Sequence, residues 1–200
     1  MTIPSQLKVN GNIKVFLSSN AQTILPLYHI VFKKWVEISP IFNFGGKPIV
    51  NYQDKPVFAE LAILKLFIDS GWDGVWVEPY GGIHFLKDMP KSWKLAQSHI
   101  SIPKDKETFL RNIQEVGKTT ACFDVFVWKD NDILFCESKH KGKDRLTNAQ
   151  IKFIEGALSC GVPEKSLLIA EWEYYEKNQP KNREIKNGRK IKTLNFRQSI

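Results

Sequence analysis

The chain has 200 residues, of which 42% are hydrophobic and 25% charged, and its formal net charge is +8. This length and apolar content fit one globular domain with a core of its own and leave little room for a second full domain. There is no apolar run of about 18 residues, which a membrane-spanning helix would need. The start of the chain lacks the charged and apolar regions of a signal peptide, so we expect a soluble, intracellular protein with no membrane partner.

Positive charge is concentrated in the last third of the chain. Residues 139–200 contain 14 Lys or Arg and 7 Asp or Glu, a net charge of +7, and the first 138 residues contribute only +1. A basic surface favours a polyanion such as nucleic acid, although basic tails are also common solubilising features. The three cysteines, Cys122, Cys136 and Cys160, form no CxxC pair. We therefore expect reduced core thiols and no zinc site.

The first fifty residues are the least informative part of the chain. Residues 7–9 and 13–16 flank Asn10 and Gly11, a pattern that predicts a hairpin with an Asn-Gly turn. The apolar and aromatic stretch 27–38 is of undetermined type. We expect residues 1–50 to form an extension packed on or near the core.

A strongly apolar helix is predicted next, over residues 56–70. Pro56 suits a first helical turn and Gly71 a C-terminal stop. The residues around Glu60 are apolar on nearly all sides, so the helix should be largely buried. Glu60 either emerges at a narrow polar edge of this helix or serves a function there.

The remaining elements alternate between strands and helices. In chain order the patterns predict strands at 73–78 and 83–86, a helix at 104–116, a hairpin after Phe123, a helix at 146–160 and a strand at 166–172. This order indicates one α/β domain in which helices flank a mixed sheet. We place a core at residues 51–177 and a basic tail, mobile or ordered by a partner, at residues 178–200.

The hairpin segment FDVFVWKDNDILFCESKHKGKDRL, residues 123–146, carries the most chemistry. If the turn is centred between Asp130 and Asn131, Asp124 lies directly opposite Glu137. Like charges at such positions are destabilising, and a divalent cation such as Mg²⁺ would compensate. Lys139 follows two residues after Glu137 and therefore shares its face of the strand. The other interpretation is a solvated face on which Asp124 and Lys139 form an ion pair.

These residues resemble a known family of nucleases. Asp124, then Glu137-Ser138-Lys139, with Glu60 on a preceding helix, is similar to the PD-(D/E)XK superfamily, and the segment from Phe123 to Val162 is similar to its VRR-NUC branch. Phe123 stands where that branch usually has proline, Ser138 replaces its usual valine, and one extra residue separates Lys139 from Asp144. The resemblance implies a restriction-endonuclease-like fold.

The resemblance also assigns roles to residues. It implies that Asp124, Glu137 and the Ser138 carbonyl hold Mg²⁺ or Mn²⁺, with Glu60 as a further carboxylate, and that Lys139 orients or activates water. It makes Gln150 an active-site residue. The residues themselves allow a second reading, because Thr147 and Gln150 also fit a helix capping box.

The loop after the second strand of the hairpin supplies the candidate nucleic-acid contacts. Lys141, Lys143 and Arg145 lie before a helix start at Thr147, where backbone amides favour phosphate. The alternatives are a solvated loop and a simple pair between Asp144 and Arg145.

We therefore expect a metal-dependent nuclease that hydrolyses phosphodiester bonds in DNA, with branched or flap DNA among the candidate substrates. By analogy with small nucleases of this fold we expect a homodimer. The alternative is a catalytically inactive nucleic-acid-binding protein with the same fold.

Overall fold

The computed structural model describes residues 2–36, 46–79, 81–92 and 94–175. Its strands are β1 (Lys8–Phe16), β2 (Gln22–Lys34), β3 (Ile49–Tyr52), β4 (Lys55–Phe58), β5 (Asp73–Glu78), β6 (His84–Leu86), β7 (Val125–Lys129), β8 (Asp132–His140) and β9 (Leu167–Tyr174). Its α-helices are α1 (Ala59–Asp69), α2 (Lys104–Val116) and α3 (Asn148–Ser159). The expected tail at 178–200 lies outside the described residues.

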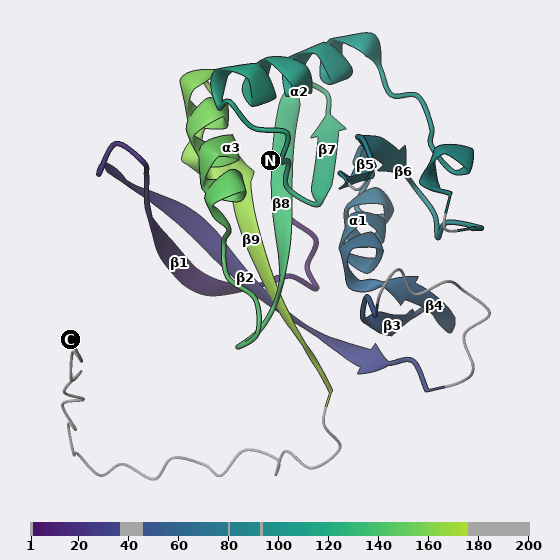
Figure 1. Cartoon of the computed structure of the whole chain (residues 1–200). Helices are drawn as coiled ribbons and strands as arrows, with labels where there is room; N and C mark the ends of the chain where they lie inside the picture. The colour runs from purple at the N-terminus through teal and green to yellow at the C-terminus, as the bar shows by residue number, and fades with distance from the viewer. Residues whose placement is uncertain (1, 37–45, 80, 93, 176–200) are drawn as a thin grey trace, which may run out of the picture.

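The nine strands form one mixed sheet, in the order β4-β3-β2-β9-β8-β7-β5-β6, with β1 paired to β2 (Figure 1). Strand β9 runs parallel to both of its neighbours, β2 and β8. The other pairings are antiparallel. The predicted single α/β domain with a mixed sheet is confirmed in this coarse form.

Alternating side chains of the central strands build two cores. In β7, Val125 and Val127 point to the core that contains α1, whereas Phe126 and Trp128 point to the core that contains α2 and α3. This is the period-two alternation of a strand that is buried on both faces. One helix therefore covers one face of the central strands, and a pair of helices covers the other.

The β7–β8 hairpin has the predicted register. Phe126 pairs with Phe135 and Trp128 with Ile133, and a two-residue turn connects the strands. The rings of Phe126 and Phe135 stack with their centroids 4.6 Å apart. Asp130 takes a positive φ of 52° in the turn. The turn centre inferred from the sequence is confirmed.

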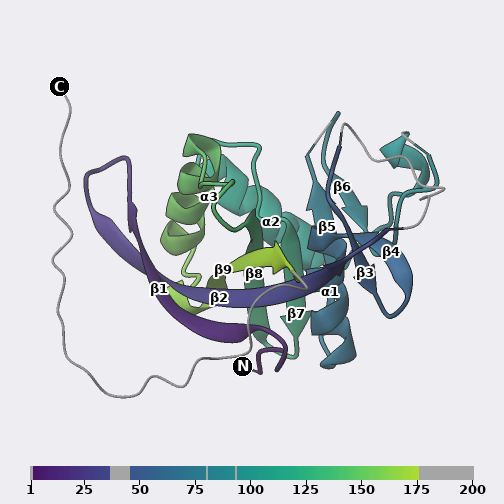
Figure 2. The same cartoon turned by 90° about the horizontal axis from the view of Figure 1, so that it is seen from below.

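The predicted N-terminal hairpin is wrong. Residues 8–16 form one continuous strand, β1, which bulges between Val9 and Asn12 and pairs with β2 along its length. Gly11, with φ of 104°, absorbs the extra residue instead of reversing the chain. The β1–β2 arm curves around the side of the molecule on which α3 lies (Figure 2).

The predicted start of the first helix is also wrong. Residues 55–58 form β4, and helix α1 begins at Ala59. Gln53 and Asp54 both take positive φ values, the geometry of a two-residue hairpin turn, and they fold β4 back onto β3. Because β4 is an edge strand, Pro56 is accommodated there without a backbone N–H.

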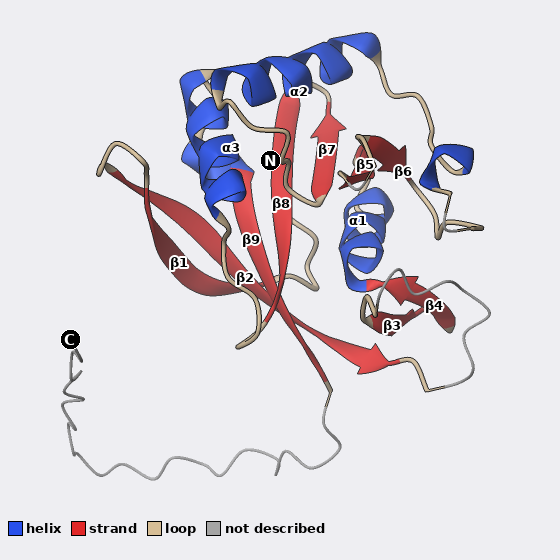
Figure 3. Cartoon of the chain, viewed as in Figure 1, coloured by secondary structure: helices blue, strands red, loops and turns tan. Residues whose placement is uncertain are grey.

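The later predicted elements agree with the structure to within one or two residues at most ends. Figure 3 shows the observed helices and strands coloured by type. The stretch of undetermined type at 27–38 belongs largely to β2. Cys122, Cys136 and Cys160 are free thiols. Over the described ranges, no helix has the length and hydropathy that crossing a bilayer requires.

Candidate active site

Asp124 and Glu137 face each other at the open end of the β7–β8 hairpin. The backbone N–H of Asp124 donates to Oε2 of Glu137 at 3.3 Å, and the N–H of Ser138 donates to Oδ2 of Asp124 at 2.9 Å. On its other side, the carbonyl of Asp124 accepts the N–H of Val77 at 2.8 Å. Hydrogen bonds to both neighbouring strands, one between backbones and two between a backbone N–H and a carboxylate, thus fix the position of Asp124.

Lys139 and Glu137 form a buried ion pair. Their side chains lie on the same face of β8, with Nζ of Lys139 2.9 Å from Oε1 of Glu137. Glu137 is 2% exposed and Lys139 is 9% exposed. The alternative of a solvated face with an ion pair between Asp124 and Lys139 is therefore wrong, because the pair is formed with Glu137 and away from solvent.

Gln150 joins this pair from the first turn of α3. Its Nε2 donates to Oε1 of Glu137, and its Oε1 accepts from Nζ of Lys139 at 3.1 Å. The same Oε1 accepts the backbone N–H of Thr147 at 2.9 Å, and the Thr147 hydroxyl accepts the N–H of Gln150 in return. The capping box and the contact with Glu137 and Lys139 thus exist together.

Glu60 approaches the cluster from the first turn of α1, accompanied by two residues that sequence reasoning missed. Nζ of Lys47 lies 3.0 Å from Oε1 of Glu60 and 3.1 Å from Oε2 of Glu78, the last residue of β5. The ammonium also lies over the ring of Trp76, 5.1 Å from its centroid. Four acids and two lysines therefore gather where β5, β7, β8 and α1 meet.

Burial and mutual repulsion dominate the electrostatics of the acids. Burial, and then the charges of Glu137 and Glu60, raise the pKa of Asp124 well above its ordinary value. Burial also raises the pKa of Glu137 from 4.5 to about 7, against the opposing effect of Lys139. For Lys47, burial lowers the pKa, but the charges of Glu60, Glu78 and Asp124 outweigh it and the pKa is raised.

The donor chemistry of the cluster suits a hard divalent cation, although the donors do not yet converge. Carboxylate oxygens are the ligands that Mg²⁺ and Mn²⁺ take. Within the described parts of the chain, Oε2 of Glu60 is one of three buried side-chain polar atoms without a hydrogen-bond partner. No three Asp, Glu, His or Cys side chains in those parts form a ready metal-binding group. Cation binding would thus require the carboxylates to turn away from their present partners.

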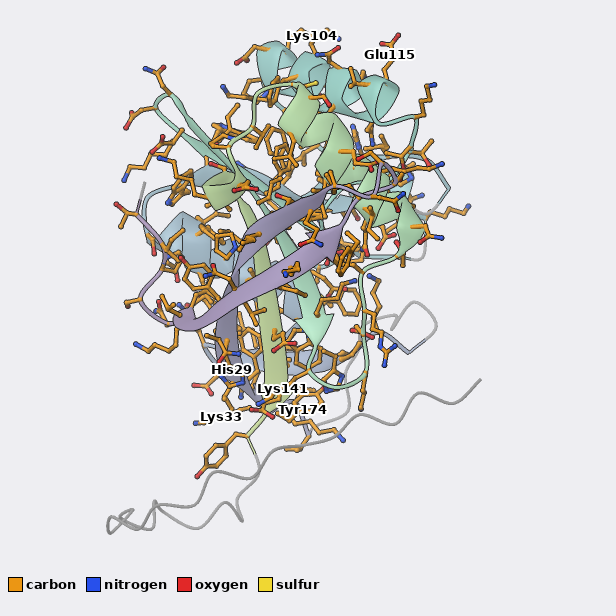
Figure 4. The ribbon with its side chains drawn as sticks, turned by 90° about the vertical axis from the view of Figure 1, so that its left-hand side faces the viewer. His29, Lys33, Lys104, Glu115, Lys141 and Tyr174 are labelled. Carbon is orange, nitrogen blue, oxygen red and sulfur yellow. The ribbon has the colours of Figure 1, made fainter. Side chains whose placement is uncertain are left out.

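The candidate nucleic-acid-binding residues Lys141, Lys143, Arg145 and Thr147 differ from one another in their contacts. Nζ of Lys141 lies 2.9 Å from Oε1 of Glu173, which also contacts His29, and Figure 4 shows Lys141 and His29 close together at one end of the molecule. Lys143 and Arg145 are exposed. Thr147 caps α3, as described above.

The alternative pair between Asp144 and Arg145 does not form. The Asp144 carboxylate accepts the backbone N–H of His140 at 2.8 Å, and no ion pair with Arg145 occurs among the described residues. The ring of His140 stacks on Trp172 with the centroids 4.1 Å apart. Asp144 therefore shapes the loop, and Arg145 stays available for a ligand.

The sequence carried a usable signal for only one of the two missed residues. Glu78 ends a predicted strand whose neighbours were apolar, and a carboxylate at the end of a buried strand is a site candidate. Lys47 precedes β3 in a region with no motif, and its contacts with Glu60 and Glu78 bridge 13 and 31 positions of sequence.

Comparisons with protein-family models, with curated proteins and with solved structures found no match.

Proposed function

We propose that the protein is a nuclease that hydrolyses phosphodiester bonds with the help of Mg²⁺ or Mn²⁺, and that its sheet and helices are a version of the restriction-endonuclease-like fold. One observation carries the proposal: Asp124, just before β7, Glu137 and Lys139 on β8, and Gln150 on α3 meet in a single connected network. The local similarity to the VRR-NUC branch supports the same assignment.

Burial of the network favours catalysis over a structural role. An ion pair removed from water contributes little net stability compared with well-packed apolar residues. Two raised carboxyl pKa values beside a lysine are typical of a functional site. The cluster therefore holds charge that the folded chain would be more stable without, and a bound cation offers a physical reason for keeping it.

Asp124, Glu137 and the Ser138 carbonyl would hold the metal ion, with Glu60 as a further ligand. When bound, such an ion lowers the pKa of water and offsets negative charge that develops on the phosphate. The ammonium of Lys139, which contacts Glu137 in the metal-free protein, would orient or activate the attacking water. Gln150 keeps Lys139 in place, because its Oε1 already accepts from the ammonium.

Lys47 acts as the counter-ion of the acidic cluster in the metal-free protein. Its ammonium contacts Glu60 and Glu78, and its charge also acts on Asp124. Two positive charges a few ångströms apart repel strongly in a partly buried site. Metal binding beside Glu60 would therefore require the Lys47 ammonium to withdraw.

A substrate panel tests the proposal. Branched DNA, flap DNA, duplex DNA, single-stranded DNA and RNA are each incubated with Mg²⁺ or Mn²⁺, and with EDTA as the control. We expect cation-dependent cleavage of at least one substrate. Binding without cleavage across the whole panel would instead support the catalytically inactive nucleic-acid-binding alternative.

A further inference from the structure

A groove of about 420 Å³ lies between β1 and the start of α3 and reaches Lys139. Its β1 wall comprises residues 13–16, and Leu146 and Ile151 form the opposite wall. The curved β1–β2 arm lies on the same side of the molecule as α3 (Figure 2). Because Lys139 also belongs to the carboxylate network, the groove adjoins the candidate active site.

The groove contains positively charged side chains that could bind a phosphate. Lys14, Arg145 and Lys139 line it, together with the acids Asp144 and Glu171. Neither Lys14 nor Arg145 forms an ion pair within the described part of the chain, whereas the Asp144 carboxylate already accepts a backbone N–H. Two exposed cations are thus free to contact an anion at the groove.

The groove also carries an aromatic side chain that stacks on no other ring among the described residues. Phe16 lines the groove and is 61% exposed, although most phenylalanines in the described chain are buried. An exposed ring beside a cation is the arrangement on which unpaired nucleobases stack. Phe16 therefore favours a base over an inorganic anion as the ligand.

The size of the groove selects an unpaired nucleotide. Sites of this volume accommodate small ligands, so one nucleotide fits but a base pair with both of its backbones does not. We propose that this groove binds an unpaired nucleotide of a single-stranded nucleic acid, with its base on Phe16 and its phosphate at Arg145, beside the network that contains Lys139. The assignment deepens the proposed function, on which it rests for the role of Lys139, by naming a substrate with a single-stranded segment.

Binding in EDTA tests the groove apart from cleavage. Fluorescence anisotropy is measured with labelled single-stranded DNA, single-stranded RNA of the same sequence and the corresponding blunt duplex. We expect Phe16→Ala to weaken single-strand binding at least fivefold with little effect on the duplex. Phe16→Tyr, which keeps a stacking ring, should restore the affinity. The DNA and RNA arms show which backbone is preferred.

Ile24→Ala is the matched control. Ile24 pairs with Lys14 across the β1–β2 ladder, is 52% exposed and does not line the groove. Equal single-strand affinities for Phe16→Ala and Ile24→Ala would overturn the inference. If single-strand binding depends on Phe16 but no substrate is cleaved, only the nuclease proposal is refuted. If a substrate is cleaved but neither its binding nor its cleavage changes in Phe16→Ala, only the groove proposal is refuted.

Discussion

The ammonium of Lys47 lies 3.0 Å from a carboxylate oxygen of Glu60, while the other oxygen of Glu60 is buried without a hydrogen-bond partner. The contact with Lys47 neutralises Glu60 in the metal-free protein. The unpartnered oxygen of Glu60 leaves a position at which a further cation could bind. If the proposed cation binds at Glu60, Lys47 and the cation would therefore compete for the same carboxylate.

Replacing Lys47 tests this competition. In Lys47→Met, Glu60 and Glu78 lose their shared cation, so the metal-free protein should unfold at a lower temperature. Its affinity for Mn²⁺ should rise, by about tenfold if the lost repulsion is near 1.4 kcal/mol. Calorimetric titration and thermal unfolding with and without Mn²⁺ measure both effects.

Lys65→Met serves as the control for that titration. Lys65 lies on α1, like Glu60, but its ion pair is with Asp88, whose side chain is 84% exposed. Its replacement should leave Mn²⁺ affinity unchanged. A Lys47→Met protein that binds Mn²⁺ no more tightly than this control would contradict the competition.

The two functions of Gln150 can be separated by comparison with Thr147. Both Gln150→Ala and Thr147→Ala break the capping box, and each should lower the free energy of unfolding by about 1 kcal/mol. Only Gln150→Ala also removes the contacts with Glu137 and Lys139. Cleavage should therefore fall much further in Gln150→Ala, as single-turnover rates would show. Equal rates in the two variants would reduce Gln150 to a helix cap.

The raised pKa of Glu137 predicts how the stability of the metal-free protein depends on pH. The folded protein holds this proton more tightly than the unfolded chain, so the resulting stability is complete below pH 4.5 and is lost as pH rises to about 7. The loss amounts to roughly 3 kcal/mol at most. Urea titrations in EDTA should show that the free energy of unfolding falls over this pH range, and that it falls more for the wild type than for Glu137→Gln. Parallel pH profiles for the two proteins would show that the carboxyl group titrates normally.

The backbones of α2 and α3 lie close together at Gly156. A Cβ there would lie 2.3 Å from the carbonyl oxygen of Ile113 and 2.8 Å from the nitrogen of Gly117. We expect Gly156→Ala to destabilise the protein by about 1–3 kcal/mol, despite the better helix propensity of alanine. Ser159→Ala, at an exposed position of the same helix, is the control for urea unfolding. A Gly156→Ala protein as stable as this control would mean that the helices separate at little cost.

Much of the fold could be predicted where the pattern was local. The β7–β8 register followed from a single turn centre, and α3 from its cap at Thr147 and its apolar stripe. The errors came from long-range pairing. Gly11 permits both a turn and a bulge, and only the pairing of β1 with β2 decides between them. Pro56 suits a helix start, but the turn at Gln53 and Asp54 places it in an edge strand.

The residues of the candidate site also differ in whether local sequence patterns could predict them. Asp124, Glu137 and Lys139 follow from the period of one hairpin, so the sequence predicted their convergence. Gln150 could be placed near them only through the family resemblance. Lys47 comes from a segment with no motif, and its ion pairs form only after β3, β5 and α1 have assembled. No sequence pattern marks such a counter-ion.

Cleavage by Lys139→Met tests the central claim most directly. Methionine keeps the length and packing of the stem but removes the ammonium that contacts Glu137 and Gln150. Lys87→Met, which removes an ammonium from a more exposed ion pair with Asp73, is the matched control. With Mg²⁺ or Mn²⁺ and the best substrate of the panel, we predict that Lys139→Met folds, binds nucleic acid and loses cleavage by at least about 100-fold, the scale of a positioned acid–base group. Cleavage at the rate of the Lys87→Met control would contradict the account.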